Sequence, residues 1–242
     1  MRTFNSIVKD CGSILASLVT ILVLCPATSI ATTRDEQLFR TFTACDRSFF
    51  EALAAEGSHW SAVMDLTTGG GIAYPKVEDR REERTRWQPL RRPLNVNGVT
   101  LIAYYDAKDL SPTATGTLGK RLFWGFLAEG EPAEVVEKLR PHISDGERVA
   151  PAKDVDWPAW IRGEWKYANE PLGHWKREEV SLGKDTAPGQ VERVLIIEGT
   201  ESGPGRKPVT GTVVECSLQG DMLPTLLHLN RPDLDDASIE NW

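Results

Sequence analysis

Histidine and cysteine are the side chains that most readily hold a metal ion or act as catalytic bases and nucleophiles. The histidines of this chain are scattered, at His59, His142, His174 and His228. No two of them have the spacing of metal ligands, and neither HExxH nor CxxC occurs anywhere in the sequence. The sequence therefore predicts no metal site and no cofactor.

Other catalytic patterns fail as well. The chain lacks the G-x-S-x-G turn of α/β-hydrolases. The stretch Gly116–Lys120 resembles part of a phosphate-binding loop, but the pattern GxxxxGK[ST] fails at Ala114 and Arg121. Glu164 and Glu170 form a carboxylate pair whose spacing is too common to indicate a glycosidase. We therefore expect a protein that is not an enzyme, and a hydrolase with dispersed carboxylates is the less favoured alternative.

Cys45 and Cys216 are the cysteines that remain after an N-terminal leader containing Cys11 and Cys25 is removed. Two cysteines in an exported chain favour one disulfide. Such a bridge would close a loop of roughly 170 residues, worth about 5 kcal/mol in the chain-entropy model. A bridged Cys45 could not act as a thiolate nucleophile. The alternative is two buried free thiols.

A basic segment lies between Lys76 and Arg92, where seven cations and four acidic residues give a local charge of +3. It has no apolar periodicity, so we expect a long surface loop between strands. Its candidate binding residues are Arg80, Arg81, Arg84 and Arg86. Such a loop could contact an acidic partner or a headgroup, or it could be a solvated loop that pairs with itself. Because it carries no core residue, changing its arginines should leave thermal stability unchanged.

Tryptophans gather in a second segment, from Ser144 to Gly173, which we expect to be an irregular link between two halves of the molecule. The rings in question are Trp157, Trp160, Trp165 and, just beyond it, Trp175. Exposed in a cleft, such rings would suit a glycan or another small ligand; the commoner use is packing onto a core.

The N-terminal 31 residues have the pattern of a secretory signal peptide. Arg2 and Lys9 precede an apolar run that is too short to span a bilayer, and small residues flank a cut after Ala31. The expected mature protein, residues 32–242, is exported, periplasmic or secreted, without a transmembrane segment. The whole chain has a formal charge of −7, and loss of a leader of net +1 leaves −8, which argues against nucleic acid as a partner.

The elements that position these residues are a helix and two similar strand-helix units. A helix capped by Asp35 carries an apolar stripe through Leu38, Phe42, Cys45, Phe49 and Leu53. In the segment 211–232 a strand presents Cys216 on its apolar face, Asp221 caps the next helix, and Pro224 lies in its first turn. The segment 119–141 is a weaker copy of this pattern.

We therefore predict an α+β fold with mainly antiparallel sheet. An N-terminal helix would be pinned by the disulfide to a compact body. Two pseudo-repeats would span about 58–143 and 165–234, followed by a short acidic tail. The alternative is that any two strand-helix junctions resemble each other.

These features favour an exported, non-catalytic protein that binds another protein, of the inhibitor, immunity or envelope-assembly type. The alternative is a small-ligand or glycan-binding protein that uses the tryptophan segment.

Overall fold

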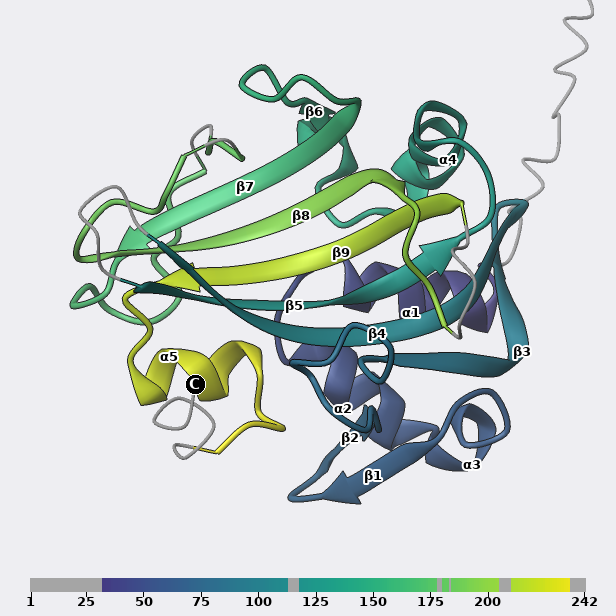
Figure 1. The fold of residues 1–242 in the computed structure, drawn as a ribbon. Coiled ribbons are helices and arrows are strands. Elements are labelled where there is room, and N and C mark those ends of the chain that lie inside the picture. The colour runs from purple at the N-terminus through teal and green to yellow at the C-terminus, as the bar shows by residue number, and fades with distance from the viewer. Residues whose placement is uncertain (1–31, 113–117, 178–179, 183, 205–209, 236–242) are drawn as a thin grey trace, which may run out of the picture. The chain divides into compact units, whose positions relative to one another are not determined.

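A long antiparallel sheet organises the part of the chain that the computed structural model describes, residues 32–112, 118–177, 180–182, 184–204 and 210–235. Within these ranges seven strands pair in the order β3-β4-β5-β9-β8-β7-β6, and β1 and β2 form a separate hairpin (Figure 1). The predicted leader and its cut after Ala31 lie outside the described residues.

The described residues form nine strands and five α-helices. The strands are β1 (Leu66–Gly69), β2 (Ile72–Pro75), β3 (Trp87–Val96), β4 (Val99–Pro112), β5 (Leu118–Ala128), β6 (Ala150–Pro151), β7 (Ala159–Tyr167), β8 (Gln190–Thr200) and β9 (Gly211–Gly220). The helices are α1 (Arg34–Phe42), α2 (Ser48–Ala55), α3 (Gly57–Trp60), α4 (Pro132–Leu139) and α5 (Pro224–Asn230), with 3-10 turns η1 (Arg140–His142) and η2 (Gly146–Arg148). The predicted mixture of helices and antiparallel strands is confirmed, with more sheet than expected.

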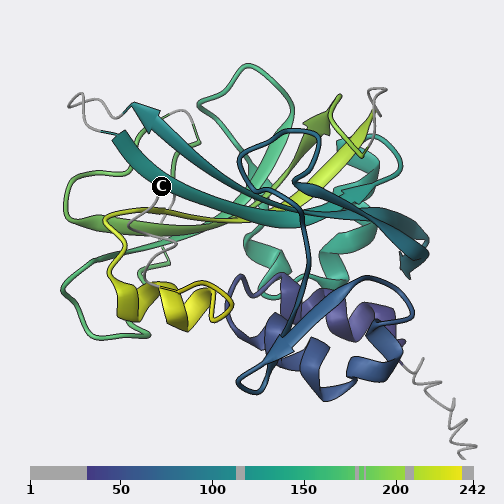
Figure 2. The same cartoon turned by 60° about the horizontal axis from the view of Figure 1, so that its bottom comes forward.

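The helices gather on one side of the sheet, as Figure 2 shows. The main core lies between them and the sheet, and the predicted apolar face of β9, at Thr212, Val214, Cys216 and Leu218, is fully buried there. Strands β5 and β9 are neighbours at the centre of the sheet, with Trp124 opposite Cys216. Among the described residues, no helix is both long and apolar enough to cross a membrane.

The single N-terminal helix that the apolar stripe predicts is two helices. Helix α1 is capped by Thr33, not Asp35: the Thr33 hydroxyl accepts from the backbone N–H of Glu36, whose carboxylate accepts from the Thr33 N–H. The chain then turns at Cys45, whose φ of 56° lies in the left-handed region, and α2 begins at Ser48. The stripe itself is buried as expected, because the turn keeps its members on one side.

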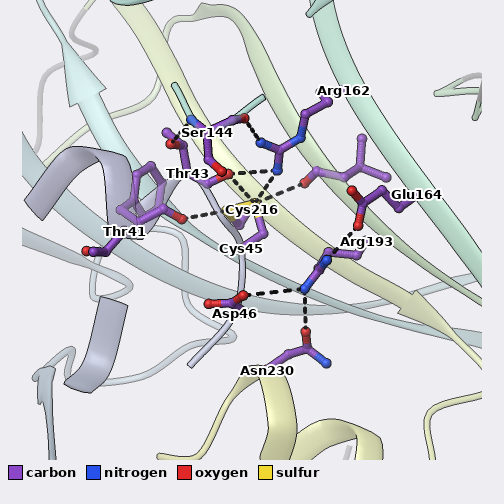
Figure 3. Close-up of a disulfide and its surroundings, with 12 residues drawn as sticks. Thr41, Thr43, Cys45, Asp46, Ser144, Arg162, Glu164, Arg193, Cys216 and Asn230 are labelled. Atoms are coloured by element: carbon purple, nitrogen blue, oxygen red, sulfur yellow. Dashed lines mark hydrogen bonds and ion pairs between the residues drawn. A yellow bond between two sulfur atoms is a disulfide. The ribbon is translucent and has the colours of Figure 1, made fainter. Parts of the chain in front are cut away.

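The disulfide between Cys45 and Cys216 is confirmed, with a Cα–Cα distance of 5.3 Å (Figure 3). Both cysteines are fully buried. The Arg162 guanidinium on β7 donates to the backbone carbonyls of Thr43 (2.7 Å) and Ser144. The buried Arg162 side chain thus links the turn at Cys45 to the turn before η2. Together with the disulfide, it fixes the position of α1 and α2 against the sheet.

The face of the sheet away from the helices carries a buried carboxyl at its centre. Cross-strand partners on six strands form one row on this face, namely Trp87, Tyr105, Gly125, Glu215, Ile196 and Ile161. Gly125 leaves room beside Glu215, since a Cβ there would come within 2.7 Å of the Glu215 Cα. Glu215 is only 7% exposed. Burial raises the pKa of its carboxyl to about 8, although the charge of Arg86 opposes the rise.

Candidate functional site

The basic segment 76–92 is a loop over residues 76–86, and residues 87–92 lie on strand β3. The expectation of one long surface loop is therefore wrong for residues 87–92. The loop follows the part of β4 that β3 does not pair. Its backbone carbonyls at Arg86 and Arg80 accept hydrogen bonds from the N–H groups of Asp106 (3.0 Å) and Lys108 (3.1 Å). We call residues 76–86 the basic loop. Its main chain thus continues the sheet pairing along β4.

A buried group of charges anchors the basic loop. Arg80 forms ion pairs with Asp106 (2.9 Å) and Asp233 (3.4 Å), whose side chains are at most 1% exposed. The Arg80 Nε–H does not point along its contact with Asp106, so that contact is an ion pair and not an aligned hydrogen bond. Val77 also packs against the main core. The expectation that the basic segment carries no core residue is therefore wrong.

The same two aspartates hold Arg231, which follows α5 and is fully buried. Its Nη2 lies 2.7 Å from Asp106 and 2.8 Å from Asp233, and its guanidinium lies over the Trp124 ring at 4.9 Å. Burial alone would lower the pKa of Arg231, but the two carboxylates outweigh it and hold that pKa above its ordinary value. Two arginines and two aspartates make this group neutral as a whole, which is the condition under which such burial is tolerable.

A pocket of about 360 Å³ opens between the basic loop, β4, β5 and the chain after α5. Its lining residues are Glu78, Asp79, Arg80, Arg81, Lys108, Leu122 and Leu234. Leu122 and Leu234 are at most 5% exposed, so they supply an apolar floor beneath charged walls. This volume lies at the lower end of the range of ligand pockets.

The structure separates the four arginines proposed as binding residues. Arg80 and Arg81 line the pocket, and Arg84 is exposed on the same loop outside the lining. Arg86 is half-buried, and its charge acts on Glu215. The basic segment therefore supplies a pocket wall and an exposed charged surface, not one uniform cluster.

The four tryptophans do not share one surface. Trp160 and Trp165 lie on strand β7, so the expectation that this segment is irregular is wrong there. Trp160 and Trp175 pack against the main core, and Arg193 lies 4.5 Å from the Trp175 ring. Trp165 packs against a second apolar cluster, with the Lys176 ammonium 4.1 Å from its ring. Trp157 is 48% exposed and donates its Nε1–H to Glu198 (2.7 Å).

The carboxylates considered as a catalytic pair have structural partners. Glu164 is buried and pairs with Arg148 (3.1 Å) and Arg193. Burial works to raise its pKa, but the nearby arginines outweigh burial and lower it. Glu170 accepts a hydrogen bond from the backbone N–H of Tyr167 (2.8 Å), which lowers its pKa. Both groups are thus held as carboxylates within local ion pairs.

Sequence reasoning missed Lys108, Asp106 and Asp233, which complete the candidate site. Asp106 and Lys108 are polar residues that lie on β4. A signal did exist: both alternate with apolar residues, Tyr105 and Ala107, as strand residues do.

Comparison of the chain with protein-family models, with curated proteins and with solved structures found no match.

Proposed function

We propose that this is an exported, non-catalytic protein of the periplasm that binds another protein, as an inhibitor, an immunity factor or an assembly factor. The observation that carries the proposal is the anchoring of the basic loop by the buried pair of Arg80 with Asp106 and Asp233. A charged loop held in one conformation loses little entropy when a partner binds, so its charges can contribute to affinity. The exposed Arg81 and Arg84 would make the contact.

The charge balance of the chain supports a partner with an acidic patch. The mature protein is acidic overall, whereas the basic loop carries five cations, Lys76, Arg80, Arg81, Arg84 and Arg86, against the acids Glu78, Asp79, Glu82 and Glu83, which leaves it a net charge of +1. A local basic surface on an acidic protein attracts an acidic patch while the rest of the molecule repels it, which orients the encounter. The small-ligand alternative loses support because Trp160 and Trp175 pack against the main core and Trp165 against a second cluster, so that of the four rings only Trp157 is exposed.

We also propose that the two halves of the sheet arose by duplication. Each half has antiparallel strands followed by a short helix that begins with proline, α4 after β5 and α5 after β9. The pairing of β5 with β9 supports this view, because the last strands of the two halves meet at the centre of the sheet.

The test of binding compares three forms of residues 32–242 as bait: the wild type, an Arg81→Glu/Arg84→Glu variant, and an Arg47→Glu/Lys138→Glu control. The control makes the same change of charge at exposed residues that lie outside the basic loop. A partner captured from the producing cell or its neighbours is identified by mass spectrometry, purified, and titrated against each form.

The proposal expects the loop variant to bind at least tenfold more weakly than the wild type and the control, with an affinity that falls as salt is added. Equal affinity of all three forms would show that the basic loop is not the contact. A turnover that one substitution abolishes would place the protein among the enzymes.

A further inference from the structure

Two polar atoms of the main core have no hydrogen-bonding partner among the described residues. They are the Tyr104 hydroxyl on β4 and the Trp124 Nε1–H on β5, and both side chains are fully buried. Burying a hydroxyl or an indole N–H without a hydrogen bond costs free energy, so such atoms are uncommon in folded proteins. These two atoms therefore call for a partner that the surrounding side chains do not supply.

The sheet places both side chains beside one buried carboxylate. Trp124 is the cross-strand partner of Asp106, and partners across a strand pair lie on the same face of the sheet. Tyr104 lies two residues before Asp106 on β4, so these two side chains also leave the same face of the strand. The three side chains are therefore neighbours on the helix side of the sheet.

The Asp106 carboxylate has one oxygen that is only weakly engaged. Its Oδ2 lies 2.7 Å from Arg231 Nη2 and 2.9 Å from Arg80 Nε. Its Oδ1 has a single, longer contact among the described residues, 3.3 Å from Arg231 Nη1. Because a carboxylate oxygen accepts about two hydrogen bonds, Oδ1 is able to accept another one.

The Tyr104 hydroxyl is a lasting donor in this place. Its ring packs against Phe126 at 5.5 Å and Phe49 at 6.2 Å, between centroids, so apolar rings surround it. Burial, and then the charge of Asp106, raise the pKa of Tyr104 above its ordinary value. The hydroxyl therefore keeps its proton at neutral pH.

Water has the donors and acceptors that these three groups require. A buried water typically makes about three hydrogen bonds to polar groups of the protein. Here it would accept from Tyr104 Oη and Trp124 Nε1 and donate to Asp106 Oδ1. A metal ion does not fit, because an indole N–H offers it no lone pair and the described residues contain no group of three metal-ligating side chains. An anion would meet the charge of Asp106.

We propose that a water molecule is bound in the core between Tyr104, Trp124 and Asp106, as a fixed member of the charged group that anchors the basic loop. By engaging Oδ1, the water holds the Asp106 carboxylate with its Oδ2 toward Arg231 and Arg80. Its role is to position this carboxylate. The inference goes beyond the proposed function and does not rest on a protein partner.

The experiment combines two measurements on residues 32–242. A crystal structure at a resolution that shows ordered solvent locates the water, and magnetic relaxation dispersion of the water signal counts long-lived internal waters. The variants are Tyr104→Phe, Trp124→Phe and the two together. Tyr105→Phe is the matched control, because it removes the neighbouring hydroxyl on the other face of β4. Thermal unfolding of each variant is recorded as well.

The expected result is an ordered water about 2.7–3.2 Å from Asp106 Oδ1 and from at least one of the two donors. The dispersion amplitude should fall by one water in the double variant and stay unchanged in Tyr105→Phe. Tyr104→Phe should lower the unfolding midpoint by about 2–4 °C, the shift typical of one lost hydrogen bond in a domain of this size.

A direct hydrogen bond from Tyr104 to Asp106 in the crystal structure, with no water between them, would overturn the proposal. An unchanged or raised midpoint in Tyr104→Phe would do the same, because a buried hydroxyl without a partner destabilises the folded state. If the double variant does not fold, the wild-type crystal structure and the Tyr104→Phe midpoint decide. Failure of the protein-binding test would leave all of these outcomes unaffected.

Discussion

Replacing the buried Glu215 by glutamine should stabilise the protein, by an amount that depends on pH. The carboxyl lies at the centre of the sheet with Ile196 and Gly125 as its cross-strand neighbours. Its pKa of about 8 in the folded protein exceeds the ordinary value of 4.5 because burial penalises the charged form. Arg86 is the cation that opposes this effect, and it does not cancel it.

The direction in which stability changes with pH follows from the raised pKa of Glu215. The folded state holds the proton of Glu215 more tightly than the unfolded state, so this contribution to stability is complete below pH 4.5 and is lost as pH rises through 8. The rise of the Glu215 pKa from 4.5 to about 8 corresponds to about 5 kcal/mol of folding stability, at about 1.4 kcal/mol for each pH unit. Such a loss is a large fraction of the 5–15 kcal/mol by which domains are typically stable, about a third or more.

The assay is urea unfolding of residues 32–242 at pH 5, 6, 7 and 8, with the disulfide intact. Glu215→Gln should match the wild type near pH 5 and exceed its free energy of unfolding by about 4 kcal/mol at pH 8. Glu192 and Glu198 also have raised pKa values through burial, but they titrate in both proteins and largely cancel in the difference. Glu134→Gln, on the surface of α4, is the control and should show no such trend.

A difference between wild type and Glu215→Gln that stays constant from pH 5 to pH 8 would refute the reasoning. In that case the carboxyl would be ionised in the folded protein at neutral pH, and the centre of this sheet face would be hydrated.

Two further predictions concern the anchors of the fold. Cys216→Ser should lower the free energy of unfolding by about 2–5 kcal/mol, and unreduced wild-type residues 32–242 should show no titratable thiol in denaturant; free thiols there would contradict the bridge. Arg80→Gln should cost about 1–3 kcal/mol in urea unfolding, because Asp106 and Asp233 lose a cation in a buried group, whereas Arg84→Gln should change stability by less than about 0.5 kcal/mol. Equal, small effects of the two substitutions would mean that Arg80 does not anchor the loop.

The disulfide and the antiparallel sheet could be predicted because both follow from local patterns. Cys45 lies on an apolar stripe, and Cys216 lies on the apolar face of an alternating strand, so each had to point into the core. The break between α1 and α2 could not be predicted in this way. Residues 43–46 contain neither glycine nor proline, and the left-handed turn at Cys45 depends on the bridge to Cys216 and on Arg162, which are distant in sequence.

The length of strands β4 and β5 could not be predicted for a related reason. Polar residues follow Tyr105, yet β4 pairs with β5 as far as Pro112. Asp106 is buried there because Arg231, far along the chain, meets its charge. A single polar residue in a sequence reveals nothing of a partner 125 positions away.

The candidate site was harder to foresee than the fold because its chemistry depends on such distant pairs. Replacing a buried ion group by apolar side chains often preserves or increases stability, so stability alone does not explain Arg80, Arg231, Asp106 and Asp233. An apolar group could close the core equally well, but it would not hold the backbone of a charged loop along β4. The buried charges fix the direction of the basic loop, and that direction places Arg81 beside Lys108 at the pocket.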